Sequence, residues 1–200
     1  MRLHLLRITL LVSVVMIPAA AGNIVTNGGF ESGLTGWTSS EDWGSGNFAV
    51  HSGSLEAYTQ CVGAACISTP TSFLYQDLAT TPSQTYDLTF WYRFQGMSMP
   101  VNELLTLAGG VVVSDLVNQS NNGGVYQSVT TTFVAAGTTT RLQFDGRNDP
   151  SFLILDDVCV VAAGETCPST STTPEPAPAS LAAVGVAAAV LARKFRRASR

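Results

Sequence analysis

The chain has 200 residues, and its charges are unevenly distributed. Seven of its ten Lys and Arg residues lie in the first 21 or the last 24 residues, and the other three are Arg93, Arg141 and Arg147. All 14 acidic residues lie between Glu31 and Glu175, so the chain between its two ends carries a charge of −11. Nucleic-acid-binding proteins need clustered Lys and Arg, so this charge argues against nucleic acid as a partner.

The first 21 residues have the pattern of a secretory signal peptide. Two arginines precede an apolar segment from Ile8 to Ile17, and Pro18 then breaks this segment. Ala19 and Ala21 satisfy the small-x-small cleavage rule. We therefore expect signal peptidase to cut after Ala21, so that the mature chain begins at Gly22 or close by. A retained N-terminal anchor is the alternative.

The body, residues 22–167, has the length of one domain, and strand signals dominate it. Residues 84–94 alternate so that Trp91 and Arg93 lie on the face opposite Tyr86 and Phe90. Further strands are predicted at 124–134, 139–145 and 153–161, with Asn- and Gly-rich turns such as 121–124 between strands. No segment outside the two ends has a helical period. The body is therefore predicted to be all-β, either a sandwich or a barrel.

All four cysteines lie in the exported body, and an even count in an oxidising compartment predicts two disulfides. Three pairings are possible. We favour Cys61–Cys66 and Cys159–Cys167, because each closes a short loop. Zinc binding is the alternative, but no Cys-x-x-Cys pair or nearby His supports it.

The C-terminal part begins with a Ser/Thr/Pro linker, residues 168–176, which ends in Pro174, Glu175 and Pro176. An apolar run follows from Ala177 to Ala192, which is shorter than the roughly 20 residues that a membrane-spanning helix needs. A basic cluster extends it and predicts a cytoplasmic C-terminus by the positive-inside rule. The cluster consists of Arg193, Lys194, Arg196 and Arg197.

This C-terminal part resembles the PEP-CTERM sorting signal of exported bacterial proteins. The features that match are, in order, the linker, Pro-Glu-Pro, an apolar helix (177–200 with its basic tail) and the chain end. The resemblance implies an exosortase-like membrane protease that cuts near Pro-Glu-Pro and removes the helix. It also implies a precursor anchored in the inner membrane and a mature protein at the cell surface or in the extracellular matrix. The helix is richer in Ala and shorter than is usual in that family. A plain C-terminal membrane anchor is the alternative, and either reading puts the body outside the cytoplasm.

Two motifs lie near the ends of the body: Asn27-Gly28-Gly29-Phe30-Glu31 with Gly36-Trp37, and Leu155-Asp156-Asp157-Val158. Together they are similar to the galactose-binding-like jelly roll found in many carbohydrate-binding modules. The resemblance covers roughly residues 23–161 and implies a single β-sandwich. The residues themselves predict that Phe30, Leu34 and Trp37 fill a core around a turn that glycine permits.

Acidic residues in the two motifs suggest a cation. Asp156 lies in a strand that is otherwise apolar on both faces, where an unpaired carboxylate would be costly, and hard carboxylate oxygens bind Ca²⁺. The resemblance implies a structural Ca²⁺ between the first and last strands, with Glu31 and Asp156 as ligands and Asp157 as a less favoured one. Alternatively, these acids cap turns or face solvent.

Sugar recognition needs aromatic faces together with polar groups that fix hydroxyls. Trp43 lies in a Gly-rich segment that is predicted to be a loop, free to contact a partner. Core packing is the competing interpretation for Trp91. The candidate ligand-binding residues are Trp43, Tyr58, Trp91, Arg93 and Tyr126.

Catalysis has little support in the sequence. His51 is the only histidine of the body, and no Gly-x-Ser-x-Gly motif surrounds it. We therefore expect a non-catalytic protein. The resemblance to a sorting system that usually accompanies exopolysaccharide production implies that the protein is exported and that its jelly roll contacts polysaccharide. One alternative is a structural or adhesive surface protein without specific sugar binding. Another is a carbohydrate-active enzyme with a carboxylate pair.

Overall fold

A computed structural model of the chain describes residues 22–60, 72–96, 101–120 and 124–168. The predicted signal peptide, Cys61, Cys66 and the predicted sorting signal lie outside these residues. Within them there is no helix long and apolar enough to cross a membrane. The described residues form eleven strands: β1 (Glu31–Leu34), β2 (Thr38–Ser39), β3 (Trp43–Gly46), β4 (Glu56–Thr59), β5 (Phe73–Ala79), β6 (Thr85–Phe94), β7 (Asn102–Ala108), β8 (Val111–Val117), β9 (Gln127–Val134), β10 (Thr139–Asn148) and β11 (Leu153–Ala162).

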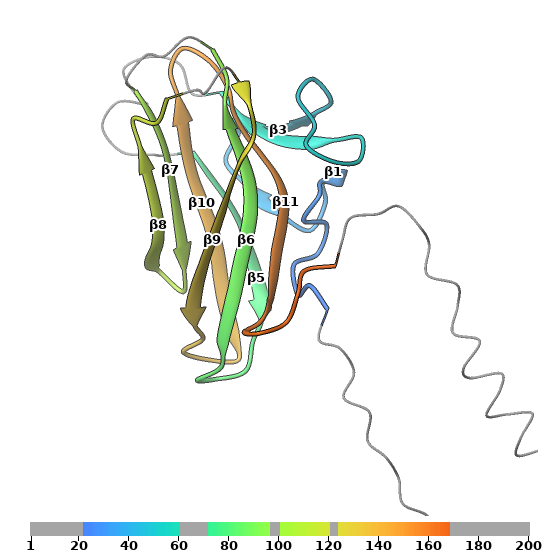
Figure 1. Ribbon diagram of the computed structural model, residues 1–200, viewed down its shortest axis with the longest axis vertical. Coiled ribbons are helices and arrows are strands. Elements are labelled where there is room, and N and C mark those ends of the chain that lie inside the picture. Colours follow the sequence, from blue (N-terminus) through green and yellow to red (C-terminus); the bar gives the residue numbers. More distant parts are fainter. Residues whose placement is uncertain (1–21, 61–71, 97–100, 121–123, 169–200) are drawn as a thin grey trace, which may run out of the picture. The chain divides into compact units, whose positions relative to one another are not determined.

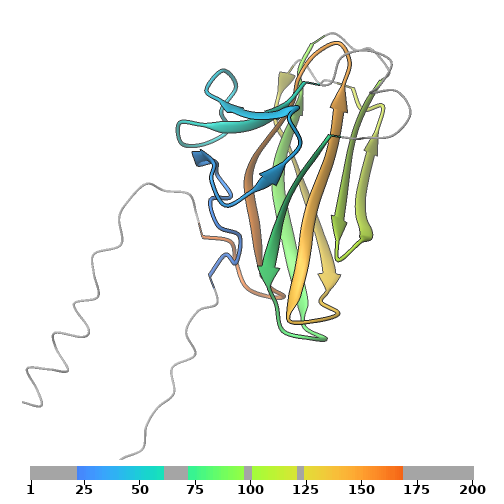
Figure 2. The same cartoon turned by 180° about the vertical axis from the view of Figure 1, so that it is seen from behind.

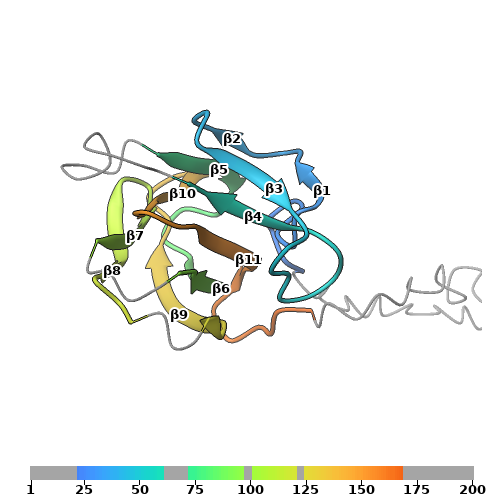
Figure 3. The same ribbon diagram turned by 90° about the horizontal axis from the view of Figure 1, so that it is seen from above.

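All of these strands except β1 form two five-stranded sheets that pack face to face (Figures 1 and 3). One sheet has the order β2-β5-β10-β7-β8, and the other has the order β3-β4-β11-β6-β9. Neighbouring strands pair antiparallel throughout both sheets. The all-β prediction is confirmed, and the two layers make a β-sandwich.

The core lies between the sheets and is built by alternating side chains. In β6 every second residue from Tyr86 to Phe94 is buried, as the alternation predicted. Phe90 of β6 meets Phe144 of β10 across the core, with ring centroids 5.1 Å apart in an edge-on arrangement. Fully burying a side chain of this kind is worth about 1.5–3 kcal/mol.

The N-terminal motif is fastened to the last strand of the fold. The amide of Val158 donates to the carbonyl of Gly28 at 2.9 Å. A Cβ on Gly28 would lie 1.9 Å from the carbonyl oxygen of Val158, so only glycine permits this approach. Phe30 and Trp37 are buried with ring centroids 5.5 Å apart, and Leu34 packs against the core, as predicted.

Strand β11 is irregular at Asp156 and Asp157, where the sequence also departs from its apolar pattern. The pairing register with β6 shifts between Asp156 and Cys159, and Asp157 has a φ of 48°. Such a bulge turns neighbouring side chains away from strict alternation. Beyond the bulge, Cys159 and Cys167 form a disulfide with an S–S distance of 2.09 Å, which is the pair that we favoured.

Candidate functional site

The outer faces of the two sheets differ in what lies on them. The outer face of β3-β4-β11-β6-β9, here called the covered face, carries the loop of residues 47–55. The outer face of β2-β5-β10-β7-β8, here called the polar face, carries alternating polar side chains. In Figure 2, β5 and β10 are at the front and this sheet is seen from its outer side. Its outward residues include Phe73, Tyr75 and Asp77 on β5, Arg141, Gln143, Asp145 and Arg147 on β10, Glu103, Leu105 and Leu107 on β7, and Asp115 and Val117 on β8.

The prediction that Trp43 is a loop residue free to contact a ligand is wrong. Trp43 begins β3 opposite Thr59 of β4, and its side chain is 5% exposed in the core. The glycines at 44 and 46 suggested a loop, but they occupy outward positions of a strand. A Cβ on Gly44 would lie 2.9 Å from the Tyr58 ring, and this close approach accounts for the glycine there.

The other four predicted ligand residues lie on the covered face, where the chain's own side chains contact the three aromatic rings among them. His51 stacks on Trp91 with centroids 4.0 Å apart and an interplanar angle of 19°. Tyr126 meets the His51 ring edge-on at 5.0 Å, and burial together with nearby carboxylates raises the pKa of Tyr126. Tyr58 packs against two phenylalanine rings, with its ring centroid 5.2 Å from that of Phe48 and 5.5 Å from that of Phe152.

Arg93 completes this group. Its guanidinium packs so closely on Gly124 that a Cβ there would lie 2.7 Å from Nη2 of Arg93. The structure thus brings Tyr58, Trp91, Arg93 and Tyr126 onto one face of one sheet. Because His51 already stacks on Trp91, that face offers less open aromatic surface than the sequence suggested.

Carboxylate side chains hold the loop of residues 47–55 through hydrogen bonds to its backbone amides. Six loop amides donate to three acidic side chains at 2.8 to 3.4 Å. Glu56 accepts from Phe48 and Ala49, Asp156 accepts from His51 and Ser52, and Glu31 accepts from Ser54 and Leu55. Glu31 and Asp156 therefore bind the same loop, at different points along it.

This arrangement bears on the predicted Ca²⁺ site. Asp156 is fully buried, and its burial raises its pKa to about 7, against the opposing effect of the amide of His51. In the described part of the chain, no three His, Cys, Asp or Glu side chains gather as a metal-binding group. Glu31, Asp156 and Asp157 thus do not form a joint cage, and amide hydrogens occupy carboxylate oxygens that a cation would need. Ca²⁺ binding itself stays a prediction.

His51, Ser52 and Asp157 lie together, although no sequence motif predicted a catalytic triad. Nδ1 of His51 is 2.6 Å from Oδ2 of Asp157, and the Ser52 hydroxyl donates to Oδ1 of the same carboxylate at 2.7 Å. A nucleophilic serine would instead donate to the imidazole. The hydroxyl is directed to the carboxylate, so the group ties the loop to the β11 bulge.

On the polar face, Tyr75 and Arg141 form the centre of an ordered group. The guanidinium carbon of Arg141 lies 3.8 Å from the centroid of the Tyr75 ring. Nε and Nη2 of Arg141 donate to the two oxygens of Asp77 at 2.8 and 3.0 Å. The hydrogen bond from Arg141 lowers the pKa of Asp77, so the pair stays charged.

Gln143 and Asp145 continue the row along β10. Gln143 stands opposite Tyr75, and Asp145 stands opposite Phe73. Nε2 of Gln143 donates to Oδ1 of Asp145 at 2.8 Å. Partial burial raises the pKa of Asp145, and the charge of Glu103 adds to the increase.

Further along β10, Arg147 pairs with Glu103 of β7 at 3.0 Å, and both side chains are largely buried. The polar face thus combines aromatic rings, an amide, carboxylates and guanidinium groups on rigid strands. Such a set of fixed donors and acceptors beside an aromatic surface suits a ligand with many hydroxyl groups. The sequence signal for it was the alternation of Arg141 and Gln143 with buried residues, which identified a strand but not a site.

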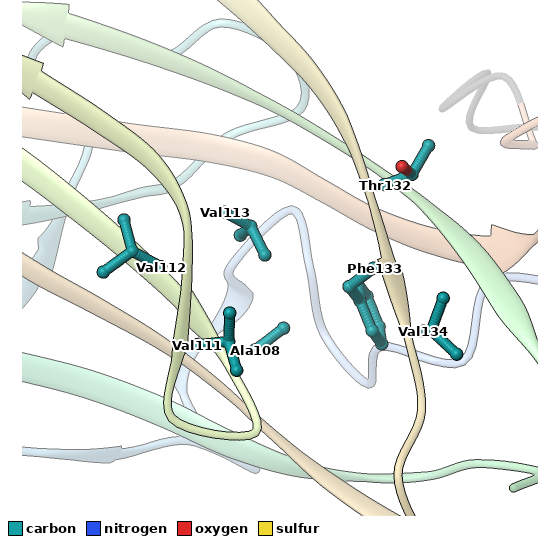
Figure 4. A pocket seen from close by; sticks show the side chains of 7 residues that line it. All are labelled: Ala108, Val111, Val112, Val113, Thr132, Phe133 and Val134. Carbon is teal, nitrogen blue, oxygen red and sulfur yellow. The ribbon is translucent and has the colours of Figure 1, made fainter. Parts of the chain in front are cut away.

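A third feature lies where the edges of the two sheets approach each other (Figure 4). The cavity there measures about 430 Å³, between the edge strands β8 and β9. The side chains around it are apolar apart from one threonine, and the hydroxyl of Thr131 bridges the strands by donating to the carbonyl of Val113. The lining consists of Ala108, Val111, Val112, Val113, Thr132, Phe133 and Val134. Such a lining does not suit a hydroxyl-rich ligand.

Comparison with solved structures relates the fold to carbohydrate-binding modules. The C-terminal family 22 carbohydrate binding module of Clostridium thermocellum Xyn10B is 13% identical, with a TM-score of 0.56, and the match covers 74% of this chain and 99% of that one. A family 16 carbohydrate binding module is 17% identical, with a TM-score of 0.53, covering 70% and 99%. The K1 cleaved adhesin domain of Lys-gingipain from Porphyromonas gingivalis W83 is 20% identical, with a TM-score of 0.55, covering 68% and 96%. At these identities the likeness establishes the fold alone.

No curated protein matches the chain in sequence. A family model does match it, over residues 22–145, and its description is carbohydrate binding domain. This match spans more than half of the chain and includes β1 to β9 and most of β10. The chain belongs to this family of carbohydrate binding domains.

Proposed function

We propose that the protein is an exported, non-catalytic module that binds polysaccharide on its polar face. The observation that carries the proposal is the row of Tyr75, Gln143, Asp145 and Arg141 on two adjacent strands, where Arg141 is exposed and the other three side chains are partly exposed. Aromatic surface and planar hydrogen-bonding groups are held there by sheet pairing, so little conformational entropy is lost on binding.

The polar face supports this role better than the covered face does. On the covered face, Trp91 is stacked with His51 and Tyr58 meets Phe48 edge-on, so a glycan would have to displace the loop of residues 47–55. That loop is held by hydrogen bonds from six of its amides to three acidic side chains. On the polar face the loop of residues 47–55 would not have to move, and the guanidinium group of Arg141, which lies over the ring of Tyr75, is itself part of the proposed binding surface.

Binding assays on the full chain test this assignment. Polysaccharides and oligosaccharides from a broad panel, including the exopolysaccharide of the source organism, are offered to the wild type and to Tyr75→Ala and Gln143→Ala. Tyr58→Ala on the covered face is the matched comparison. We expect the first two variants to lose binding and the third to retain it. The reverse pattern would move the site to the covered face.

The route of the protein is the second part of the proposal. The signal-peptide pattern that ends at Ala21 and the sorting pattern from Pro174 to Arg197 support export and exosortase-type processing. The disulfide between Cys159 and Cys167 supports an oxidising, extracellular compartment. Mass spectrometry of the mature protein tests the route. A mature form that retains its first 21 residues or an intact tail would refute it.

A structural Ca²⁺ near Glu31 and Asp156 is also part of the proposal. Its support is the chemistry of the donors, because two carboxylates act on one loop and one of them is fully buried. The loop would have to turn carbonyl oxygens toward the ion to complete its coordination.

An adhesive or structural surface role without sugar affinity is the second candidate. The fold likeness to an adhesin domain is compatible with it. Retention of the protein on immobilised polysaccharide separates the two. Saturable retention that free polysaccharide competes away supports the module, whereas absence of retention on every glycan supports the structural role.

A further inference from the structure

On the polar face the acidic side chains outnumber the basic ones. Both of its guanidinium groups are already paired with acids of the same face, Arg141 with Asp77 and Arg147 with Glu103. The remaining acids are Asp145 and Asp115. Among the described residues no ion pair joins either of them to a cation.

The two unpaired carboxylates occupy the same row across the sheet. Asp145 of β10 stands opposite Leu105 of β7, and Leu105 stands opposite Asp115 of β8. With strands about 4.8 Å apart, the two positions are separated by about 10 Å, on the scale of a disaccharide. Leu105 between them offers an apolar surface for the face of a sugar ring.

Asp145 is the stronger anchor of the two. Its Oδ1 accepts a hydrogen bond from the neutral amide of Gln143, and the side chain is half-buried beside Glu103. A partly buried carboxylate near a second negative charge is stabilised by a cation more than an exposed carboxylate would be. A protonated amine that reaches this point gains a charge-assisted hydrogen bond.

We propose that the polysaccharide recognised on the polar face carries free amino groups, whose ammonium ions pair with Asp145 and Asp115. This rests on the proposed function, because it specifies the ligand class of the same site. The charge of −11 that the chain carries between its two ends acts in the same direction. It attracts a polycationic glycan and repels glycans that carry uronate or sulfate.

The test compares chitosan oligosaccharides with their fully N-acetylated counterparts, which share the sugar backbone but lack the charge. The full chain is titrated with each by calorimetry, at a pH between the pKa values of carboxylates and of sugar amines. We expect the free amines to bind at least about tenfold more tightly. Asp145→Asn should remove most of this difference, and Glu165→Gln, which removes an equal charge from an exposed position outside the polar face, should preserve it.

Three outcomes would overturn the proposal. Equal affinity for both oligosaccharides would refute the recognition of free amino groups, although the proposed polysaccharide binding would stand. Equal losses in Asp145→Asn and Glu165→Gln would mean that only the overall charge attracts the ligand. No binding of these or of any glycan in the broad panel would refute both the ligand class and the proposed function.

Discussion

Arg141 lies over the ring of Tyr75, with its guanidinium carbon 3.8 Å from the ring centroid. Asp77 fixes this position, because it accepts two hydrogen bonds from the guanidinium group. The three residues thus act as one unit on β5 and β10. A ligand meets a preformed surface of planar groups rather than a mobile arginine.

Asp77→Asn should weaken polysaccharide binding several-fold and leave the melting temperature nearly unchanged. Asp77 and Arg141 are both half-exposed, and exposed ion pairs contribute little to stability. The substitution removes one of the two carboxylate acceptors and the negative charge, so Arg141 is less firmly held over Tyr75. Affinity electrophoresis and thermal melting check the two parts. A large drop in melting temperature with unchanged binding would contradict this role.

Gly28→Ala should destabilise the fold by about 3 kcal/mol or more, because its methyl group would collide with the carbonyl oxygen of Val158. Gly29→Ala is the matched control. A Cβ at Gly29 meets only a carboxylate oxygen of Asp157 at 3.5 Å, which is an ordinary contact. Urea denaturation measures both variants. If the two lose the same free energy of unfolding, the close approach of the N-terminal motif to β11 is not the cause.

The stability of the metal-free protein should fall as pH rises from about 4 to about 7. Burial raises the pKa of Asp156 from 3.8 to about 7. In this window the folded state holds a proton that the unfolded state has lost, so raising the pH favours unfolding. Above pH of about 7 this contribution stays constant. Denaturation in the presence of EDTA, across this range, measures the slope.

Asp156→Asn isolates the contribution of Asp156 to that slope. The variant should be less stable at every pH, because its amide hydrogens would face the amides of His51 and Ser52. Its free energy of unfolding should nevertheless vary less with pH than that of the wild type. Glu165→Gln should keep the wild-type slope. An unchanged slope in Asp156→Asn would show that other groups cause the dependence.

Added Ca²⁺ should raise the melting temperature, and EDTA should reverse the increase. A ligand that binds only the folded state stabilises it in proportion to the logarithm of its concentration. Glu31→Gln should reduce the shift, because Glu31 is one of the two proposed carboxylate ligands. If neither Ca²⁺ nor EDTA shifts the melting temperature, the proposed site is eliminated. Glu31 and Asp156 would then serve only to hold the loop of residues 47–55 through hydrogen bonds.

The strands that sequence predicted best are those with one buried face. Strand β6 alternates strictly, and its buried and outward residues were both assigned correctly. The bulge in β11 also left a signal, because two adjacent acids interrupt an apolar strand. Strand β3 was missed because its two glycines look like loop residues. Glycine is needed at these two positions because side chains from β4 and from the loop of residues 47–55 approach them closely.

The candidate site was less predictable than the fold. Gln143 and Tyr75 stand opposite each other only because β10 pairs with β5, and this register joins segments far apart in the chain. Alternation along one strand tells which residues point outward, but not which partners they meet. The choice of Trp91 and Tyr126 failed to anticipate the loop of residues 47–55, whose position depends on carboxylates from β1, β4 and β11.

The measurement that tests the central claim most directly is polysaccharide binding by two variants that differ only in the sheet face they alter. Tyr75→Ala changes the polar face, and Tyr58→Ala changes the covered face. Each is titrated with the same oligosaccharide, after melting curves establish that both variants are folded. We predict that Tyr75→Ala lowers affinity at least about tenfold, as loss of an aromatic contact at the centre of a site does, and that Tyr58→Ala binds like the wild type. Undiminished binding by Tyr75→Ala would contradict the assignment of the polar face.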